Sequence, residues 1–221
     1  MSSLGTNKLR AALTMLGITI GVFSVISVMT AVGALQNSIE GGLSFLGSNI
    51  FQFAKYPANV SAGGDVKEKY QNRRNISYRQ ALRYYELMEG YASEICLKTF
   101  AYEVKGQAVY NGVKTTPNLL IVGTNRGFLA ANAHTVEYGR NLNDEDVAFS
   151  RRVVVIGKII EKRLFPQETP IGKVIRVSGH TYTVIGVLAE KGSAFGQSRD
   201  DLCLMPITRF FEDYGEVNRT V

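Results

Sequence analysis

The stretch Ala11–Leu35, AALTMLGITIGVFSVISVMTAVGAL, contains no charged residue and no proline. As a helix it would extend about 37 Å, and the hydrocarbon core of a bilayer is about 30 Å thick. Its polar side chains are Thr and Ser, which can donate hydrogen bonds to carbonyls of their own helix. The stretch therefore predicts a membrane-spanning helix over residues 11–35.

Three other interpretations fit this stretch less well. A buried core helix is rarely so long and so free of charge. A signal peptide has an apolar region of about 7–15 residues and then a small-residue cleavage site, which Gly33-Ala34-Leu35 matches only weakly. A helix lying in the membrane interface needs a charged face, and the stretch has none.

The charges beside the stretch predict its orientation. Lys8 and Arg10 precede it, and the first charged residue after it is Glu40. Positively charged flanks stay on the cytoplasmic side. We therefore expect a cytoplasmic N-terminus over residues 1–10 and an extracytoplasmic chain after about residue 36. Residues 36–48 are expected to extend the helix out of the lipid before glycines loosen it.

Gly17 and Gly21 form a GxxxG motif within the predicted span. Two glycines one turn apart leave a groove in which another helix can approach closely. The alternative is coincidence, because glycine is frequent in membrane helices. We take Gly17 and Gly21 as the candidate helix-packing residues.

The chain after the span predicts an α+β domain over residues 49–221. Its first part has the pattern of a β-α-β unit, in which Ser77 and Gln80 form a capping box before the helix. The expected elements are a strand at 49–56, a loop at 57–75, a helix at 78–89 and a strand at 93–104.

A mostly β part follows, and Asn111-Gly112 is its strongest hairpin signal. The expected strands are 107–110, 113–115, 119–122, 152–156, 174–178, 181–187 and 201–205, with Gly179-His180 as the turn of the second hairpin. Helical segments are expected at 125–132 and at 158–165. A third helix is expected from Pro206 to about Tyr214, with Pro206 at its favoured position in the first turn. Residues 218–221 resemble the start of another strand, so we expect the natural protein to continue beyond Val221.

Composition argues against several functions. The net charge of +6 comes from scattered basic residues that form no run and do not alternate with aromatic residues. A solvated surface therefore explains it better than nucleic-acid binding. Cys96 and Cys203 lie far apart without metal-ligand spacing. Two buried free thiols are one interpretation, and a disulfide in an oxidising compartment is the other.

The sequence shows no catalytic or cofactor motif. Gly157-Lys158 lacks the glycine and hydroxyl that a phosphate-binding loop requires, so we expect no ATP hydrolysis by this chain. His180 is expected to be a solvated turn residue, and His134 has no neighbouring ligands at metal spacing. The acidic run 144–146 after Asn143 is expected to begin a helix or lie in a solvated loop. We predict no enzyme, metal or cofactor site.

Several stretches in order resemble MacB-like ABC transporter permeases, the FtsX-like family with a MacB periplasmic core domain. Residues 7–22, NKLRAALTMLGITIGV, resemble the first-helix signature of that family, and residues 139–147, GRNLNDEDV, resemble its Gly-Arg turn and acidic segment. Residues 152–157, Leu164-Phe165, 170–173 and 184–187 resemble its core domain.

The resemblance implies a four-helix permease whose outer domain lies between helices one and two. It divides that domain into a Porter-like part, 49–104 with 201–221, and an inserted Sabre-like part, 105–200. It implies that the three later helices and the ATPase lie outside this chain. ATP binding there would drive a mechanical change in the outer domain (mechanotransmission).

The implied location is the bacterial inner membrane, in contact with lipid. The implied partners are an ABC ATPase subunit, a second permease in a homodimer or heterodimer, and a periplasmic adaptor with an outer-membrane channel. Efflux of drugs, peptides or other compounds is the first expectation, and lipoprotein release is an alternative. A third hypothesis is a non-transport, membrane-anchored protein that regulates cell-wall enzymes or senses a ligand.

Overall fold

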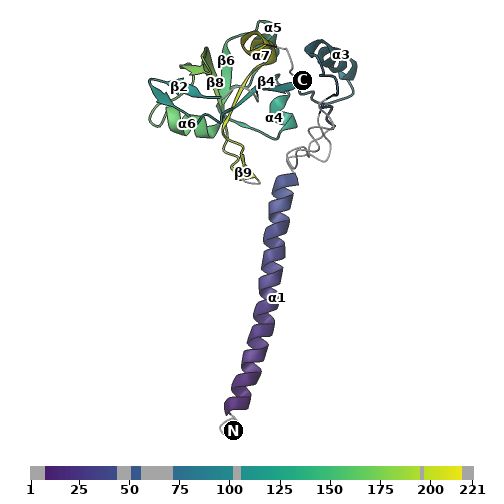
Figure 1. Cartoon of the computed structure of the whole chain (residues 1–221), viewed down its shortest axis with the longest axis vertical. Helices are drawn as coiled ribbons and strands as arrows, with labels where there is room; N and C mark the ends of the chain where they lie inside the picture. The colour runs from purple at the N-terminus through teal and green to yellow at the C-terminus, as the bar shows by residue number, and fades with distance from the viewer. Residues whose placement is uncertain (1–7, 44–50, 56–71, 102–105, 195–196, 216–221) are drawn as a thin grey trace. The chain divides into compact units, whose positions relative to one another are not determined.

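The computed structural model describes residues 8–43, 51–55, 72–101, 106–194 and 197–215. The chain divides into two compact units, Met1–Leu46 and Gly47–Val221. Figure 1 shows both units.

The first unit is one helix, α1 (Lys8–Leu43), which runs without interruption. This confirms a helix over residues 11–35 and its continuation to Leu43; residues 44–48 of the predicted extension lie outside the described residues. Thr14, Thr19 and Thr30 each donate a hydrogen bond to the carbonyl four residues earlier. Among the described helices, α1 is the one long and apolar enough to cross a membrane, over Arg10–Leu35.

The second unit is built on a mixed sheet that contains nine strands among the described residues. Their order is β1-β4-β11-β6-β8-β7-β2-β3, and β5 also pairs with β8. The strands are β1 (Lys98–Phe100), β2 (Ala108–Tyr110), β3 (Val113–Lys114), β4 (Leu120–Thr124), β5 (Val136–Gly139), β6 (Val153–Ile156), β7 (Val174–Val177), β8 (His180–Leu188) and β11 (Leu202–Pro206). A separate two-stranded arm consists of β9 (Ser193–Ala194) and β10 (Gln197–Ser198).

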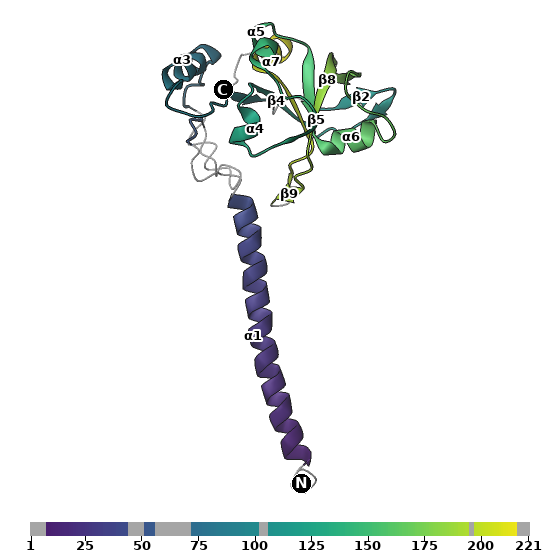
Figure 2. The same ribbon diagram turned by 180° about the vertical axis from the view of Figure 1, so that it is seen from behind.

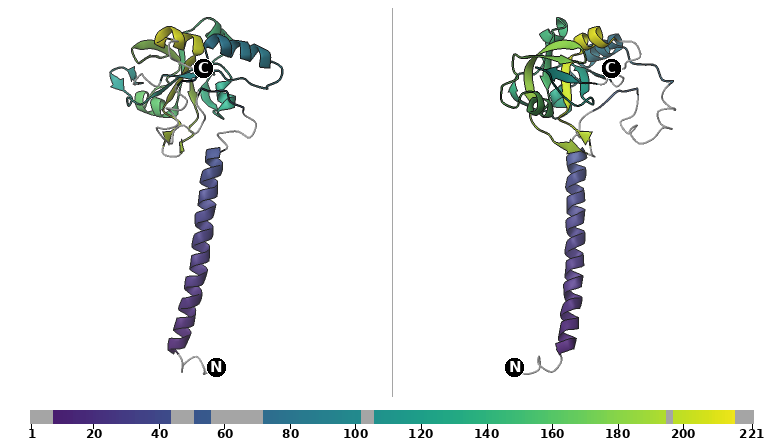
Figure 3. Two further views of the ribbon diagram at one scale, coloured as in Figure 1. Left: turned by 45° about the vertical axis from the view of Figure 1, so that its right-hand side comes forward. Right: turned by 60° about the vertical axis from the view of Figure 1, so that its left-hand side comes forward.

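Helices cover both faces of this sheet. They are α3 (Tyr78–Met88), α4 (Phe128–Ala131), α5 (Asp144–Ala148), α6 (Lys158–Leu164) and α7 (Ile207–Tyr214). One core joins α6 and α7 to the sheet, and the other joins α4 to the opposite face. Figure 2 shows α5 beside α7, and Figure 3 shows α3 beside α7, where Tyr78 and Phe211 are in ring contact.

Strand β11 shows why the centre of the sheet is buried on both sides. Side chains alternate between faces along a strand, and Cys203 and Met205 enter the first core while Leu202 and Leu204 enter the second. Its neighbours β4 and β6 alternate in the same way. A continuous apolar run is the expected pattern for a strand covered on both faces.

One turn and one cap predicted from the sequence are confirmed. Ser77 and Gln80 form both hydrogen bonds of the capping box before α3. Asn111 and Gly112 have φ values of 46° and 82° between β2 and β3, as a tight hairpin turn with two left-handed residues requires. The expected α+β class, an apolar N-terminal helix followed by a mixed-sheet domain, is also confirmed.

Four local predictions are wrong in detail. Residues 51–55 form no regular strand, although their alternation predicted one at 49–56. The strand predicted over 93–104 is limited to β1 within the described residues. A strand exists only where a partner accepts its backbone hydrogen bonds, and alternation does not supply that partner.

The other two corrections concern a turn and a cap. The turn before β8 is Ser178-Gly179, with φ values of 47° and 95°, so His180 begins the strand. Pro206 ends β11 and is the N-cap of α7, not a first-turn residue. The strand predicted at 218–221 lies outside the described residues. Strands from both predicted parts of the domain join one sheet, and the division into those parts stays a prediction.

Candidate functional site

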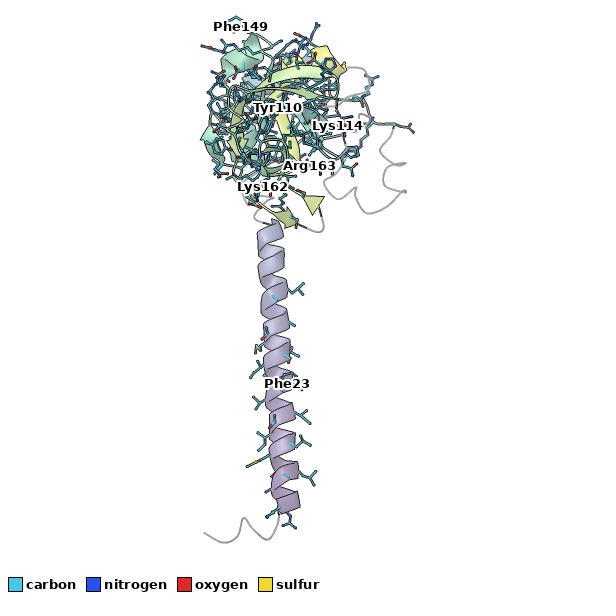
Figure 4. The ribbon with its side chains drawn as sticks, turned by 90° about the vertical axis from the view of Figure 1, so that its left-hand side faces the viewer. Phe23, Tyr110, Lys114, Phe149, Lys162 and Arg163 are labelled. Atoms are coloured by element: carbon cyan, nitrogen blue, oxygen red, sulfur yellow. The ribbon has the colours of Figure 1, made fainter. Side chains whose placement is uncertain are left out.

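The predicted helix-packing residues lie on an open face of α1. A Cβ atom added at Gly17 or at Gly21 would meet no other atom within 4 Å. Gly33 is equally open, but at about 100° per residue its direction is about 140° from the midpoint of the other two. The two glycines therefore share one face on which a second helix could pack closely. Phe23 is among the large apolar side chains that project from α1 in Figure 4, and it is 70% exposed.

A buried carboxylate lies within the acidic segment that was expected to begin a helix or remain solvated. Asp146 belongs to α5, so a helix does begin there, and its side chain is fully buried. Arg140 donates to both carboxylate oxygens, at 2.6 and 3.1 Å, and Arg151 lies 3.4 Å away. Asn143 and Asp146 form a reciprocal capping box. The helix alternative of the prediction is therefore confirmed, and Asp146 is the buried member of the acidic run.

Electrostatics explain why Asp146 stays charged. Burial alone would raise its pKa, but hydrogen bonds from Arg140 and from the Asn143 backbone hold the pKa below its ordinary value. The arrangement ties the chain after β5 to α5. We interpret it as a structural brace, because all its neighbours stabilise the carboxylate and none is a nucleophile.

Glycine is required where this brace meets the sheet. Gly139 has a φ of +85°, and a Cβ there would lie 2.4 Å from the Ile185 carbonyl oxygen. A Cβ at Gly186 would lie 2.2 Å from the Arg140 carbonyl oxygen, and Arg140 donates its backbone N–H to Ile185. The Gly139-Arg140 motif is therefore explained by close packing of two backbones.

A second buried carboxylate, Asp213 on α7, connects three elements. Arg209 donates to both of its oxygens, and the Tyr182 hydroxyl donates at 2.6 Å. His180 Nδ1 lies 3.3 Å from Asp213 Oδ1, and Arg152 Nη2 lies 3.8 Å from the same oxygen. His180 is thus not the solvated turn residue that was expected. The cluster joins α7, the β7–β8 hairpin and the start of β6.

The pKa values in this cluster follow from burial and hydrogen bonding. Burial would raise the pKa of Asp213, but Arg209 and Tyr182 outweigh it and hold the pKa below its ordinary value. Burial, with the hydrogen bond to Asp213, raises the pKa of Tyr182. Both groups therefore keep their ordinary charge states at neutral pH, and the cluster holds elements together without supplying a proton donor or acceptor for chemistry.

The cysteines and histidines do not form a site. Both cysteines are free, and Cys203 is fully buried in β11. Cys96 Sγ lies 3.8 Å from the Thr124 hydroxyl, and burial raises the pKa of both thiols. Across the residues that the structure describes, no group of three or more His, Cys, Asp or Glu side chains is placed to hold a metal ion.

Several aromatic side chains of the second unit are exposed, among them Tyr91 at 87% and Phe51 at 78%. Phe149, which follows α5, is 70% exposed and lies at the rim in Figure 4. The Arg151 guanidinium lies 5.7 Å from its ring centre. The sequence pattern did not single out Phe149, because exposure of an aromatic residue depends on what packs against it.

The observed molecule is therefore a mixed-sheet domain joined to a helix long enough to cross a membrane. The family model for the MacB-like periplasmic core domain matches residues 11–221. This match includes both α1 and the sheet domain, and the chain belongs to this family.

Curated relatives carry the same family name. A macrolide export ATP-binding/permease protein MacB from Bdellovibrio bacteriovorus is 32% identical over 205 residues, covering 93% of this chain and 30% of the relative. The protein of the same name from Rhodopirellula baltica is 31% identical over 216 residues, covering 94% of this chain and 29% of the relative. The chain thus spans about 30% of the length of these relatives.

Two crystal structures have a similar fold. The periplasmic region of MacB from Actinobacillus actinomycetemcomitans is 20% identical with a TM-score of 0.56, covering 72% of this chain and 67% of that one. The extracellular domain of the noncanonic ABC-type transporter YknZ from Gram-positive bacteria is 22% identical with a TM-score of 0.52. The match covers 66% of this chain and 70% of that one. At these identities the likeness concerns the fold alone.

Proposed function

We propose that this chain is a membrane-anchored part of a permease subunit of an ATP-driven ABC transporter. The observation that supports it best is the family match over residues 11–221, which spans the apolar helix and the sheet domain together. In this proposal the three later helices follow Val221, and the sheet domain consists of the Porter-like and Sabre-like parts outlined above.

The proposed orientation places residues 1–10 in the cytoplasm and the sheet domain outside the inner membrane. Lys8 and Arg10 support it, because they are the charges nearest the N-terminal end of the span. An accessibility assay would test it. A cysteine introduced at Phe149 should react with a membrane-impermeant maleimide in intact spheroplasts, and labelling only after lysis would contradict the orientation.

Energy would come from ATP hydrolysis on another domain or subunit, since the chain contains no phosphate-binding loop. ATP binding would favour one of two global arrangements of a permease homodimer or heterodimer, and the outer domains would move with it. The relatives are named for macrolide export, which supports efflux over lipoprotein release. A periplasmic adaptor and an outer-membrane channel enter this proposal only through the family resemblance.

The first test uses the full-length natural protein purified from its own membranes. We expect an ABC ATPase domain or subunit to be present and vanadate to inhibit ATP hydrolysis. A lone permease chain without ATPase activity or ATPase partner would contradict the transporter proposal and favour a membrane-anchored interaction protein.

Gly17 and Gly21 are proposed to form the close contact between α1 and another helix. Their open face supports this role. Gly17→Leu combined with Gly21→Leu should fill the groove and weaken dimerisation of the permease in detergent. Gly33→Leu is a control on a different face, where it adds the volume of one of the two substitutions at an equally open position. Equal dimerisation of both variants and the wild type would remove this assignment.

A further inference from the structure

The β9–β10 arm leaves the sheet domain between β8 and β11, and one carboxylate holds its base. Asp200 is 4% exposed. Its two oxygens accept the backbone N–H groups of Lys191 at 2.8 Å and Gly192 at 2.7 Å. Arg199 closes the base by donating its backbone N–H to the Gly192 carbonyl oxygen at 3.0 Å. The base is therefore an ordered structure, connected to two central strands.

The loop between α4 and β5 packs against this base. Lys191 Nζ donates to the Asn132 carbonyl oxygen at 2.6 Å, and the Ala189 N–H donates to the Thr135 carbonyl oxygen at 2.9 Å. His134 lies in the loop between these two contacts. Its ring stacks on Phe128 with a centre distance of 5.8 Å and an interplanar angle of 18°.

The His134 imidazole is placed as a neutral group. Its Nδ1 atom is buried and has no hydrogen-bond partner among the described residues. The charged groups that face it come from the two sides of the arm base: the cations Lys191 and Arg199, and the anion Asp200. Helix α4, on which the ring stacks, has no charged residue. Asp200 already accepts two backbone N–H groups. A proton added to His134 would therefore lie close to the positive charges of Lys191 and Arg199.

The same surroundings change the acidity of the ring. Burial and the charge of Lys191 lower the pKa of His134 from 6.5 to about 4, against the opposing effect of Asp200. In the closed form, the α4–β5 loop packs on the arm base as observed; in an open form, the loop has left the base and His134 is exposed. Because its pKa is lowered in the closed form, His134 binds fewer protons there than in the open form. The closed form is therefore favoured above the ordinary pKa, and that advantage is lost as the pH falls from 6.5 toward 4.

We propose that His134 is an acid-sensitive latch on the base of the β9–β10 arm. The neutral imidazole keeps the α4–β5 loop packed on Lys191 and Ala189, and its protonation releases the loop and loosens the arm. The latch follows from the contacts of the sheet domain alone and does not depend on the transport proposal. In the proposed extracytoplasmic location, it would respond to the pH of the surroundings.

The expected effect is set by the difference in proton binding between the two forms. Between pH 7.5 and pH 5.5 an exposed histidine goes from mostly neutral to mostly protonated, while the packed one remains neutral. The population of open molecules should therefore rise about tenfold over this range.

Amide hydrogen exchange of the full chain in detergent micelles would test the latch. The Ala189 and Gly192 amides should show about tenfold more opening at pH 5.5 than at pH 7.5, after correction for the intrinsic exchange rate. The Val155 amide in the central sheet serves as a reference for global unfolding. Equal opening of Ala189 and Gly192 at the two pH values would overturn the proposal.

Two variants assign the effect to one side chain. His134→Gln should abolish the pH dependence, and His180→Gln should retain it. A tenfold change that persists in His134→Gln would assign the titration to another group and would also overturn the proposal. Protection of Val155 reports whether each variant is folded, and the wild-type pH comparison remains decisive if a variant is not.

Discussion

Phe23 and Phe210 are the same type of residue in opposite surroundings. Phe23 on α1 is 70% exposed, whereas Phe210 on α7 is fully buried in the core of the sheet domain. The apolar side chains of α1 have no protein core to enter, so a membrane or another helix must cover them. Those of the sheet domain cover one another. Substitutions of similar chemistry should therefore have very different effects in the two units.

The largest difference is expected between Phe210→Ala and Phe23→Ala. Removing a fully buried phenyl ring leaves a cavity and should cost about 3–5 kcal/mol of domain stability. Phe23→Ala should leave the stability of the sheet domain unchanged. Guanidinium unfolding in detergent, followed by near-ultraviolet circular dichroism of the tyrosines, would measure both. A similar loss for the two variants would contradict the separation of the units.

Glycines provide the next comparison. A Cβ at Gly157 would lie 2.2 Å from the Asp200 carbonyl oxygen, whereas a Cβ at Gly33 would meet nothing within 4 Å. Gly157→Ala should therefore destabilise the sheet domain by about 1–3 kcal/mol through overpacking. Gly33→Ala should leave that domain unaffected. Thermal unfolding of the two variants would show whether the close approach is as intolerant as the geometry implies.

The Asp213 cluster predicts a pH-dependent effect. Asp213→Asn should cost about 1–3 kcal/mol at neutral pH, because Arg209 and Tyr182 lose a charged acceptor. The carboxyl pKa is held below its ordinary value of 3.8, so this contribution is present above pH 3.8 and is lost as the pH falls through the lowered pKa. Unfolding free energies of wild type and variant should converge in strong acid, and a constant difference would contradict the assignment.

The smallest effect is expected at Asp144, which lies two residues before the buried Asp146 in the chain. Asp144 pairs with Arg126 at 3.1 Å, but both side chains are more than half exposed. Asp144→Asn should cost about 0–1 kcal/mol and should lose its effect in 1 M salt. Urea unfolding at low and high salt would measure it. A larger or salt-independent loss would show that the pair is more than a surface contact.

The sheet domain shows where sequence patterns succeed and where they stop. Ser77, Gln80, Asn111 and Gly112 were assigned correctly because caps and tight turns depend on backbone groups within a few residues. The alternation at Phe51–Lys55 predicted a strand and none formed, because strand formation also needs a distant partner. Acidic residues 144–146 look alike in sequence, whereas in the structure Asp146 is buried beside Arg140 and Arg151 and Asp144 is exposed.

The candidate functional residues show the same contrast between local patterns and contacts of distant segments. Gly17 and Gly21 could be chosen from their spacing alone, because the two faces of a helix follow from its period. Neither His134 nor Asp213 could be chosen in that way, because their partners come from segments far along the chain. For His134 the relevant groups are Lys191, Arg199 and Asp200.

The sequence by itself determined the long apolar helix, the Asn111-Gly112 turn, the capping box before α3 and the resemblance to MacB-like core domains. These depend on composition and on interactions between near neighbours. Only the tertiary structure decided the strand order, the burial of Asp146 and Asp213, and the packing of His134 against the arm. The physical reason is that burial and charge pairing depend on residues brought together by folding, and no local pattern specifies them.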